Sequence, residues 1–491
     1  MTGILIAGTS SDAGKSLVVT GLCRALVRRG IDVVPFKAQN MSNNSAVCAD
    51  GAEIGRAQYL QAQAARVEPV ADLNPVLLKP GSDRRAFVVV DGRPAGELEA
   101  GEYATGRSHL AAAAFAAHER LADAHDLVVV EGAGSPAEIN LRERDYVNLG
   151  LARRFGLPVV LVGDIDRGGV LASLYGTWGL VDDADRALLR GYIINKFRGD
   201  PSVLDPGLVE ITRRTGMPCL GVLPWLDDVW LDGEDALEVA RWEHAPHPDP
   251  VTLTVAVVRF PRISNATDVD ALAHTPGVAV DVSTDPDACA AADLLVLPGS
   301  RSTVTDLAWL RARGMAAVVR ARHEAGRPTL GICGGYEMLA VTIDDEVESG
   351  AGTVPGLGVL PVEVTFGPKI TARSRFAWRE HQVDGYEIHH GACRITGPVD
   401  EDFLDGVRVG ATCGTLLHGA LEDDGFRNAF LGWVAQTTGS AWVPDAGRLG
   451  HAARREAMIE RLADAVETHV DLDALLALTS EPGNAGGRDG R

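Results

Sequence analysis

The stretch Gly8-Thr9-Ser10-Ser11-Asp12-Ala13-Gly14-Lys15-Ser16 follows a short apolar run and leads into residues 14–29, where apolar side chains recur at helical spacing. Glycines allow backbone N–H groups to face phosphate oxygens, Lys15 can neutralise phosphate charge, and the Ser16 hydroxyl can ligate Mg²⁺. The first glycine lies one position earlier than the usual phosphate-loop spacing requires. The order of strand, loop and helix still predicts a nucleotide site comprising Gly8, Thr9, Asp12, Gly14, Lys15 and Ser16.

The pattern around this loop is typical of an α/β protein. Short runs rich in Val, Ile and Leu alternate with helical stretches, as expected for mostly parallel sheets covered by helices. The runs lie near residues 3–8, 31–37, 127–131, 157–163, 191–196 and 217–223, and again near 253–260, 278–283, 293–297 and 328–332. We therefore predict two doubly wound, mostly parallel α/β domains.

A proline-rich stretch separates the two series of runs. Pro246, Pro248 and Pro250 fall close together, which is typical of a linker. A length of 491 residues also favours more than one domain. We expect a nucleotide-binding ligase domain over 1–240, a linker over 241–251, a second α/β domain over 252–435, a helical extension over 436–480 and a disordered tail over 481–491.

The amino-acid composition argues against several classes of binding partner. The formal net charge of −21 argues against nucleic-acid binding and against adsorption to anionic membranes. The seven cysteines show neither paired CxxC spacing nor a zinc pattern. No apolar run approaches the ~18 residues of a membrane span, and the first residues read as a buried strand and not as a signal peptide. We expect a cytoplasmic protein with a small-molecule substrate, with homo-oligomer formation left open.

Two carboxylates are candidates to complete the metal site. Glu131 ends the run 127–131 and precedes a glycine-rich loop, at the sheet edge where ligands of α/β proteins collect. Glu53 is the second candidate, and a solvated helix face is the alternative interpretation of that position.

The second half contains a cysteine in the setting of a nucleophile. The stretch Gly331-Ile332-Cys333-Gly334-Gly335 leads from an apolar run into a helical pattern, which predicts a sharp turn with an exposed thiol at a helix N-terminus. The helix dipole would favour the thiolate, and the N–H of Gly334 can donate to an oxyanion. A second oxyanion donor is expected near Gly299, which also follows an apolar run.

The general base should be a histidine far along the chain. His418, in Gly414-Thr415-Leu416-Leu417-His418-Gly419, is the first choice because it ends an apolar run beside glycine. His389 and His390 compete with it.

These segments resemble two known families. The phosphate loop, Glu131 and its loop, and Asn195 resemble dethiobiotin synthetase and the partition-type ATPases, which implies a magnesium role for Glu131 and an adenine contact for Asn195. The Cys333 and His418 segments resemble the class-I glutamine amidotransferases. That family usually places Glu two residues after His, where this chain has Ala420. The third group is therefore missing or comes from elsewhere, and we predict a Cys333–His418 dyad.

Several further segments are more specific. They are 36–45, 74–80, 131–140, 162–170 and 195–200, and in this order they resemble the adenosylcobyric acid synthase family of cobalamin biosynthesis. The resemblance implies amidation of carboxylates b, d, e and g of adenosyl-cobyrinic acid a,c-diamide, a corrinoid, with ATP, Mg²⁺ and glutamine as ammonia donor. It also suggests substrate contacts from Gln39, Asn40, Asn43, Asp164, Asp166 and Arg167.

Two other functions are considered. The chain could be a cobyrinic acid a,c-diamide synthase or another carboxylate amide synthase, although the segments 37–41 and 164–169 favour the first family. A phosphate-loop switch ATPase with a degenerate amidase module is the non-enzymatic alternative. The intact Cys333 turn with His418 disfavours it.

Overall fold

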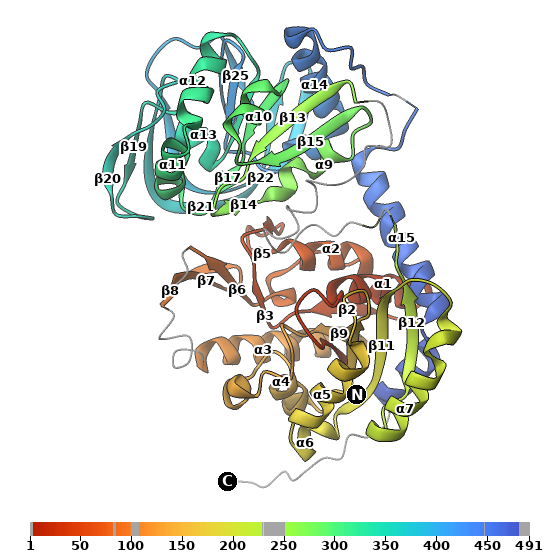
Figure 1. Cartoon of the computed structure of the whole chain (residues 1–491). Helices are drawn as coiled ribbons and strands as arrows, with labels where there is room; N and C mark the ends of the chain where they lie inside the picture. Colours follow the sequence, from red (N-terminus) through yellow and green to blue (C-terminus); the bar gives the residue numbers. More distant parts are fainter. Residues whose placement is uncertain are drawn as a thin grey trace.

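The computed structural model describes residues 3–81, 85–99, 108–227, 229, 251–445 and 447–480, and the statements below concern these residues. They form two lobes, one above the other in Figure 1, with helix α15 (His451–His469) running along one side from the second lobe to the first. The predicted tail 481–491 and nearly all of the predicted linker 241–251 lie outside the described residues.

The first lobe is built on a six-stranded parallel sheet in the order β12-β11-β10-β1-β9-β2. Ile4 and Ile6 of its central strand join one hydrophobic cluster, and the alternate residues Leu5 and Ala7 join another. Burial on both faces explains the continuous apolar runs in the sequence. The strands are β1 (Gly3–Gly8), β2 (Val33–Phe36), β9 (Leu127–Glu131), β10 (Val159–Asp164), β11 (Leu189–Phe197) and β12 (Cys219–Pro224).

Helices cover both faces of this sheet, and the 14-residue helix α1 follows the glycine-rich loop directly. The helices are α1 (Lys15–Arg28), α2 (Arg56–Ala65), α3 (Ser108–Ala124), α4 (Leu149–Phe155), α5 (Val170–Leu180), α6 (Asp183–Arg186) and α7 (Asp205–Thr215), with 3-10 turns η1 (Ala71–Leu73), η2 (Ile139–Arg144) and η3 (Pro201–Leu204).

Two small sheets extend the first lobe. One has the order β3-β6-β7-β8 and the other is the β4-β5 pair. Their strands are β3 (Gln39–Met41), β4 (Ser45–Val47), β5 (Glu53–Gly55), β6 (Val76–Pro80), β7 (Arg85–Val90) and β8 (Arg93–Glu99). Figure 1 shows β5 and α2 on the side of the first lobe that faces the second.

The second lobe has a seven-stranded sheet in the order β15-β13-β16-β18-β25-β24-β23, which is parallel from β15 to β25. Its strands are β13 (Leu253–Val258), β15 (Val278–Ser283), β16 (Leu294–Leu297), β18 (Thr329–Ile332), β23 (Glu401–Phe403), β24 (Gly406–Val409) and β25 (Thr412–Thr415). Around it lie η5 (Ala266–Val269), α9 (Asp270–Ala273), α10 (Pro286–Ala291), α11 (Thr303–Ala312), α12 (Met315–Glu324), α13 (Gly334–Leu339), η6 (Ala420–Glu422) and α14 (Asp424–Thr438). The predicted fold class, two mostly parallel α/β units, is confirmed.

The second lobe also contains a mixed four-stranded sheet and a short antiparallel pair. The long pair β21 (Val362–Trp378) and β22 (His381–Ile395) joins β19 (Thr342–Asp345) and β20 (Gly352–Pro355) in one sheet, and β14 (Ile263–Ser264) pairs with β17 (Gly299–Ser300). Tyr386 and Ile388 of β22 pack against Val47 of β4, so this sheet contacts the first lobe.

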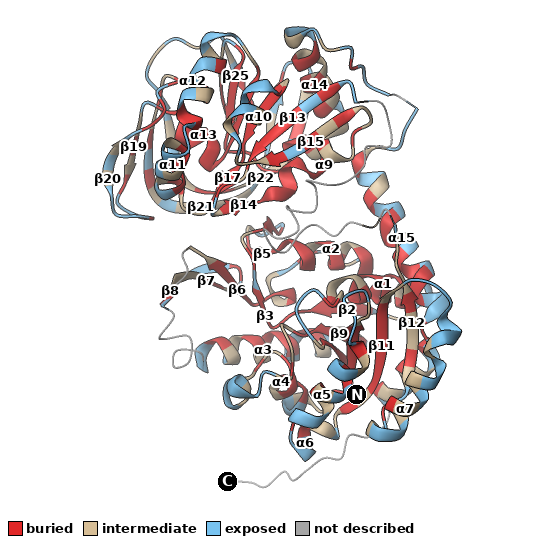
Figure 2. Cartoon of the chain, viewed as in Figure 1, coloured by how far each residue is buried: buried red, intermediate tan, exposed pale blue. Residues whose placement is uncertain are grey.

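The C-terminal helices return to the first lobe. Met458 and Val466 of α15, and Leu475 of α16 (Leu472–Ser480), join the cluster that contains Ile4 and Ile6. Arg24 of α1 is buried and donates to Glu456 at 2.6 Å. Figure 2 shows buried residues on α15 where it runs along the first lobe. The part of the predicted extension from α15 onward therefore packs in the first lobe's core, whereas Trp442 packs in the core of the second lobe. No helix among the described residues combines the length and apolarity that a membrane span requires.

Candidate active sites

The loop between β1 and α1 forms an anion site at a helix N-terminus. Gly14 caps α1 with φ of +92°, a conformation that favours glycine. Lys15 Nζ donates to the carbonyl oxygens of Ser10 at 3.1 Å and Gly134 at 3.3 Å, so its ammonium group lies over the loop. Backbone N–H groups, the helix dipole and one ammonium group together provide the elements of a phosphate site.

Ser16 and Glu131 meet beside this loop. The Ser16 hydroxyl donates to Glu131 Oε1 at 2.9 Å, and Lys37 Nζ lies 2.8 Å from the same oxygen. Burial alone would raise the pKa of Glu131, but Lys37 and a hydrogen bond from Gln61 hold it below its usual range. An ionised carboxylate beside a hydroxyl fits the oxygen ligands that Mg²⁺ prefers. Sequence reasoning missed the role of Lys37, although it lies in one of the motifs.

Asn195 supports the phosphate loop in this structure. Its Nδ2 donates to Ala13 O at 3.0 Å, and a Cβ at Gly14 would lie only 2.1 Å from that nitrogen. The neighbouring Lys196 donates to Asp12 O at 2.7 Å. The adenine contact of Asn195 remains a prediction.

The predicted substrate residues fall into two groups. Asp164 ends β10, Asp166 and Arg167 follow it, and all three form ion pairs there: Asp164 with Lys196 at 2.7 Å and Arg167 with Asp12 at 3.6 Å. Asp166 pairs with Arg198 at 3.2 Å. This group thus lies beside the phosphate loop, where a phosphoryl acceptor would have to bind.

The second group, Gln39, Asn40 and Asn43, forms hydrogen bonds with other residues of the protein. Gln39 accepts a hydrogen bond from Tyr146, and Asn40 Nδ2 donates to Gln58 at 3.1 Å. Asn43 Nδ2 donates to Pro80 O at 3.2 Å. Their substrate contacts remain predictions.

The expectation that Glu53 joins the metal site is corrected by the structure. Glu53 is 1% exposed, and its Oε1 accepts from Lys79 at 2.6 Å and from the Ser45 hydroxyl at 2.8 Å. Its Oε2 is ion-paired with Lys369 of the second lobe. Both oxygens are therefore neutralised by lysines, whose charges hold the pKa of Glu53 below its usual range against the opposing effect of burial. Glu53 joins the two lobes.

Cys333 occupies a strained turn between β18 and α13. Its φ of +50° and ψ of −113° are unusual for a residue with a side chain, as expected of a nucleophile elbow. Its N–H donates to Thr415 O at 2.8 Å, which ties the turn to the end of β25. A strained conformation held by two buried strands fixes the direction of the thiol.

The surroundings of Cys333 favour the protonated thiol over the thiolate. Burial raises the pKa of Cys333 well above its usual range, the charge of Glu337 adds to this effect, and a hydrogen bond from the N–H of Gly334 opposes it. Desolvation of the site opposes the thiolate that was expected at this helix N-terminus, and α13, which is only six residues long, offers a weak dipole. A proton acceptor is required.

His418 has a carboxylate partner that the sequence did not indicate. Its Nδ1 lies 2.7 Å from Asp268 Oδ2, and Asp268 Oδ1 accepts from Gly419 N at 2.8 Å. Both side chains are buried, and His418 Nε2 makes no hydrogen bond to any described residue. The predicted dyad is therefore revised to an arrangement with a third group, Asp268 of η5. Its position, far upstream of His418, is why the spacing rule did not find it.

The two expected oxyanion residues lie against this site. A Cβ at Gly299 would be 3.2 Å from His418 Cε1, and one at Gly334 would be 2.9 Å from Ser300 N. Both approaches are tighter than a side chain normally tolerates, which favours glycine at these positions. Their roles as oxyanion donors remain predictions.

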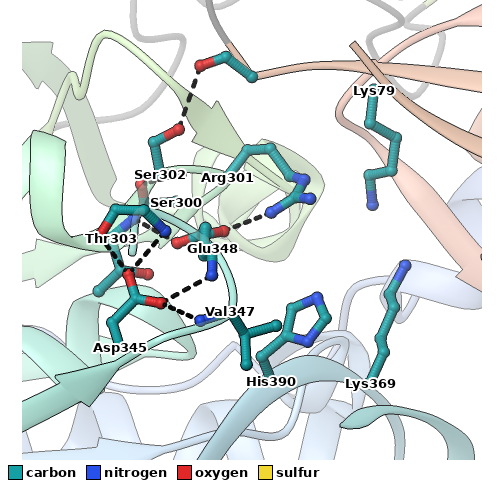
Figure 3. A network of polar contacts seen from close by, with 12 residues as sticks. Lys79, Ser300, Arg301, Ser302, Thr303, Asp345, Val347, Glu348, Lys369 and His390 are labelled. Atoms are coloured by element: carbon teal, nitrogen blue, oxygen red, sulfur yellow. Dashed lines mark hydrogen bonds and ion pairs between the residues drawn. The ribbon is translucent and has the colours of Figure 1, made fainter. Parts of the chain in front are cut away.

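A cavity of ≈ 40 Å³ adjoins Cys333 and includes residues of both lobes. Figure 3 shows Lys79 and Lys369 reaching toward the same region from different parts of the chain. On its other side Arg301 is ion-paired with Glu348, which also accepts from Thr303 N at 2.9 Å. Burial raises the pKa of Glu348 to about 7 in spite of Arg301. The cavity thus offers charges of both signs, as a zwitterionic amino acid requires.

The competing histidines are engaged elsewhere. His389 Nδ1 lies 2.8 Å from Gly391 O and its Nε2 lies 3.2 Å from Glu387 Oε1. His390 Nδ1 lies 3.0 Å from Gly367 O. Both line the cavity, but only His418 has a carboxylate partner on one nitrogen and an unpaired second nitrogen among the described residues.

Each lobe matches a known protein family. Residues 4–238 match the family described as CobQ/CobB/MinD/ParA nucleotide binding domain, and residues 254–426 match the CobB/CobQ-like glutamine amidotransferase domain. The fold and sites thus define a glutamine amidotransferase joined to a nucleotide-binding domain.

Comparison with relatives along nearly the whole chain identifies the family within this class. The chain is 66% identical to a cobyric acid synthase of Cutibacterium acnes, over 97% of this chain and 100% of that protein. It is 55% identical to one from Mycolicibacterium vanbaalenii and 53% identical to one from Streptomyces avermitilis, each over 97% of this chain and 96% of the relative. The chain belongs to the cobyric acid synthase family, as the sequence motifs predicted.

Proposed function

We propose that the chain converts adenosyl-cobyrinic acid a,c-diamide to adenosyl-cobyric acid by amidating carboxylates b, d, e and g. Each amide consumes one glutamine and one ATP, and the reaction takes place in the cytoplasm during cobalamin biosynthesis. One observation carries the proposal. This member of the family has a phosphate loop in one lobe and, in the other, a cavity at Cys333 whose wall includes Lys79 of the first lobe.

The second lobe releases ammonia. Cys333 Sγ attacks the side-chain amide carbon of glutamine, and His418 Nε2 accepts the thiol proton and returns it to the leaving ammonia. Asp268 holds the proton of Nδ1, so Nε2 is the basic nitrogen, and its charge stabilises the imidazolium that forms. Backbone N–H groups near Gly299 and Gly334 receive the developing oxyanion. Water then hydrolyses the thioester, and glutamate leaves.

The first lobe activates the carboxylate. A carboxylate oxygen of the corrinoid attacks the γ-phosphorus of ATP, ADP leaves, and the resulting acyl phosphate reacts with ammonia to give the amide and phosphate. Lys15 and the N–H groups of the loop position the phosphates and stabilise the transferring charge. Ser16 and Glu131 would hold Mg²⁺, which supplies further positive charge at the phosphates.

Release of ammonia next to the lobe interface has a chemical reason. Ammonia is nucleophilic only when unprotonated, and in bulk water near neutral pH it is mostly ammonium. The Cys333 cavity is flanked by Lys79 and Lys369, which are bound to Glu53 at the junction of the lobes. Ammonia formed there is already beside the ligase lobe.

The test supplies purified protein with ATP, Mg²⁺, glutamine and the a,c-diamide, and follows the corrinoid by mass spectrometry. Four successive exchanges of hydroxyl for amide are expected, and no exchange contradicts the proposal. Cys333→Ala should abolish reaction with glutamine but retain reaction with ammonium salts, whereas Lys15→Ala should abolish both. Cys289→Ala, a buried cysteine of the second lobe outside the cavity, is the matched control.

A further inference from the structure

The turn that carries Asp268 is stabilised from the other lobe. η5 spans only Ala266–Val269, and it follows Asn265, whose φ of 49° and ψ of 44° are left-handed. The first N–H groups of a helix have no partner within the helix and need an external acceptor. Here Ala266 N donates to the side-chain oxygen of Asn44, at 3.0 Å, across the lobe interface. Asn44 therefore acts as an N-terminal cap supplied by the first lobe.

Two further hydrogen bonds make this contact reciprocal. Asn265 Oδ1 accepts from Ser45 N at 3.0 Å, and Asn265 N donates to Asn43 O at 3.4 Å. Asn44, Ser45 and Asn265 are all buried. We call this contact between residues 43–45 and 265–266 the interlobe clasp. Hydrogen bonds excluded from water hold their geometry tightly, because an unpaired buried group is unfavourable.

The first-lobe side of the clasp is itself rigid. Asn44 N donates to the Ser42 hydroxyl at 3.0 Å, and Asn44 O accepts from Arg56 N at 3.1 Å. The Ser45 hydroxyl donates to Glu53, which is bound by Lys79 and Lys369. The same chain segment begins at Lys37, which pairs with Glu131 of the phosphate site. The position of Asn44 thus depends on the packing of the first lobe.

The second-lobe side leads to the general base within a few residues. Asp268 follows Ala266 in the same turn, and it holds both His418 Nδ1 and Gly419 N. Asn265 and Ser264 also line the cavity beside Cys333. A shift of the turn would move the carboxylate that orients His418, and misplacement by about 1 Å can lower a rate about 100-fold.

We propose that Asn44 is a positioning residue for glutamine hydrolysis, which fixes the Asp268 turn through the interlobe clasp and makes the glutaminase site depend on docking of the ligase lobe. The inference rests on the proposed function and adds a coupling element to it. Ammonia would then be released at full rate only when the lobe that consumes it is in place.

The test compares three variants. Asn44→Ala removes the acceptor for Ala266 N, Asn44→Asp keeps an oxygen in that place, and Arg373→Ala removes other interlobe contacts, with Val47 O at 3.0 Å and Glu68 at 3.2 Å, that do not touch the turn. The measurements are kcat and KM for glutamate release from glutamine, and amidation driven by an ammonium salt.

For Asn44→Ala we expect kcat for glutamine to fall about 10-fold or more, with KM within about 2-fold, because the orientation of the base is lost and the cavity lining is kept. Amidation with ammonium should stay within about 2-fold, since the phosphate site is intact. Asn44→Asp should recover most of kcat, and Arg373→Ala should resemble the unaltered protein. Alkylation of Cys333 by iodoacetamide should slow only in Asn44→Ala, because it depends on the proton acceptor.

Three results would overturn the proposal: unchanged kcat in Asn44→Ala, equal losses of glutamine- and ammonium-driven reaction in that variant, or an equal loss in Arg373→Ala. Failure of Asn44→Asp to recover activity while remaining active with ammonium would also count against it. If the unaltered protein releases no glutamate from glutamine, the proposed function fails first. If it does and Asn44→Ala does so equally well, only the positioning role fails.

Discussion

His418 Nδ1 lies 2.7 Å from Asp268 Oδ2, although 150 residues separate them in the chain. The two come together because His418 follows β25, whereas Asp268 lies on the η5 turn that follows β14, and the glycine of β17 leaves room for the imidazole between them. This hydrogen bond is buried, so the orientation of the imidazole is fixed before any substrate binds.

Asp268→Asn should therefore impair glutamine hydrolysis severely. The amide cannot stabilise the imidazolium and can hold the wrong tautomer, so we expect kcat to fall about 10²- to 10⁴-fold. Steady-state assay of glutamate release measures this, with the exposed Asp281→Asn as control. Activity within a few-fold of the unaltered protein would show that His418 does not need the carboxylate.

Glu53→Gln should weaken the junction of the lobes. The substitution leaves the buried Lys79 and the partly buried Lys369 without a counter-charge, and breaking a buried pair in other proteins lowers the free energy of unfolding by about 3–5 kcal/mol. The midpoint of urea unfolding should fall accordingly. Glu97→Gln, which removes an exposed pair with Arg85, should change the free energy by less than about 1 kcal/mol. Equal effects of the two substitutions would contradict this account.

His118 should make the first lobe sensitive to acid. It is buried against Phe36 and Phe155, both ring nitrogens lack a hydrogen bond to any described residue, and burial lowers its pKa from 6.5 to about 4. The unfolded chain takes up a proton below about pH 6.5 and the folded chain only near pH 4. The stability that the neutral ring contributes is thus present above pH 6.5 and is lost as the pH falls, up to roughly 3 kcal/mol.

His118→Leu should reduce this acid sensitivity. Denaturant unfolding at several pH values between 7 and 4 would show a smaller loss of stability than in the unaltered protein. His109→Gln, on the exposed side of the same helix, should leave the pH dependence as it is. Identical profiles for His118→Leu and the unaltered protein would assign the acid sensitivity to other groups.

Gly21→Ala should destabilise the protein although alanine favours helix. A Cβ at Gly21 would lie 2.8 Å from both Leu462 O and Val466 Cγ2 of α15, so the crossing of α1 and α15 must open, at about 1–3 kcal/mol. Gly176→Ala in α5 meets no atom within 4 Å and should stabilise by about 0.5–1 kcal/mol. Thermal unfolding of the two variants should shift in opposite directions.

Local chemistry explains which features could be predicted from the sequence. The phosphate loop and the Cys333 turn depend on glycines and reactive side chains that are adjacent in the chain, so spacing alone indicated them. The pairing of Ser16 with Glu131 followed from parallel strands, whose carboxyl ends meet at one edge.

Tertiary contacts explain what could not be predicted. Asp268 lies in no recognisable sequence motif. A carboxylate that only has to accept a hydrogen bond from one imidazole nitrogen can be supplied by any nearby turn. The sequence suggested Glu53 as a metal ligand, because it does not show that Lys79 of the first lobe and Lys369 of the second pair with this carboxylate. The long β21-β22 pair was missed because its strands alternate between buried and exposed residues and contain no continuous apolar run.

The return of α15 and α16 to the first sheet constrains the order of synthesis. Helix α1 packs against α15, whose residues Met458, Ile459 and Val466 share a hydrophobic cluster with Val18, and these residues leave the ribosome only after the second lobe. The N-terminal lobe therefore remains with an uncovered apolar face while the whole second lobe is being translated and can fold. The lobe made first is the one completed last, and the nascent chain is most exposed to aggregation and to chaperones during that interval.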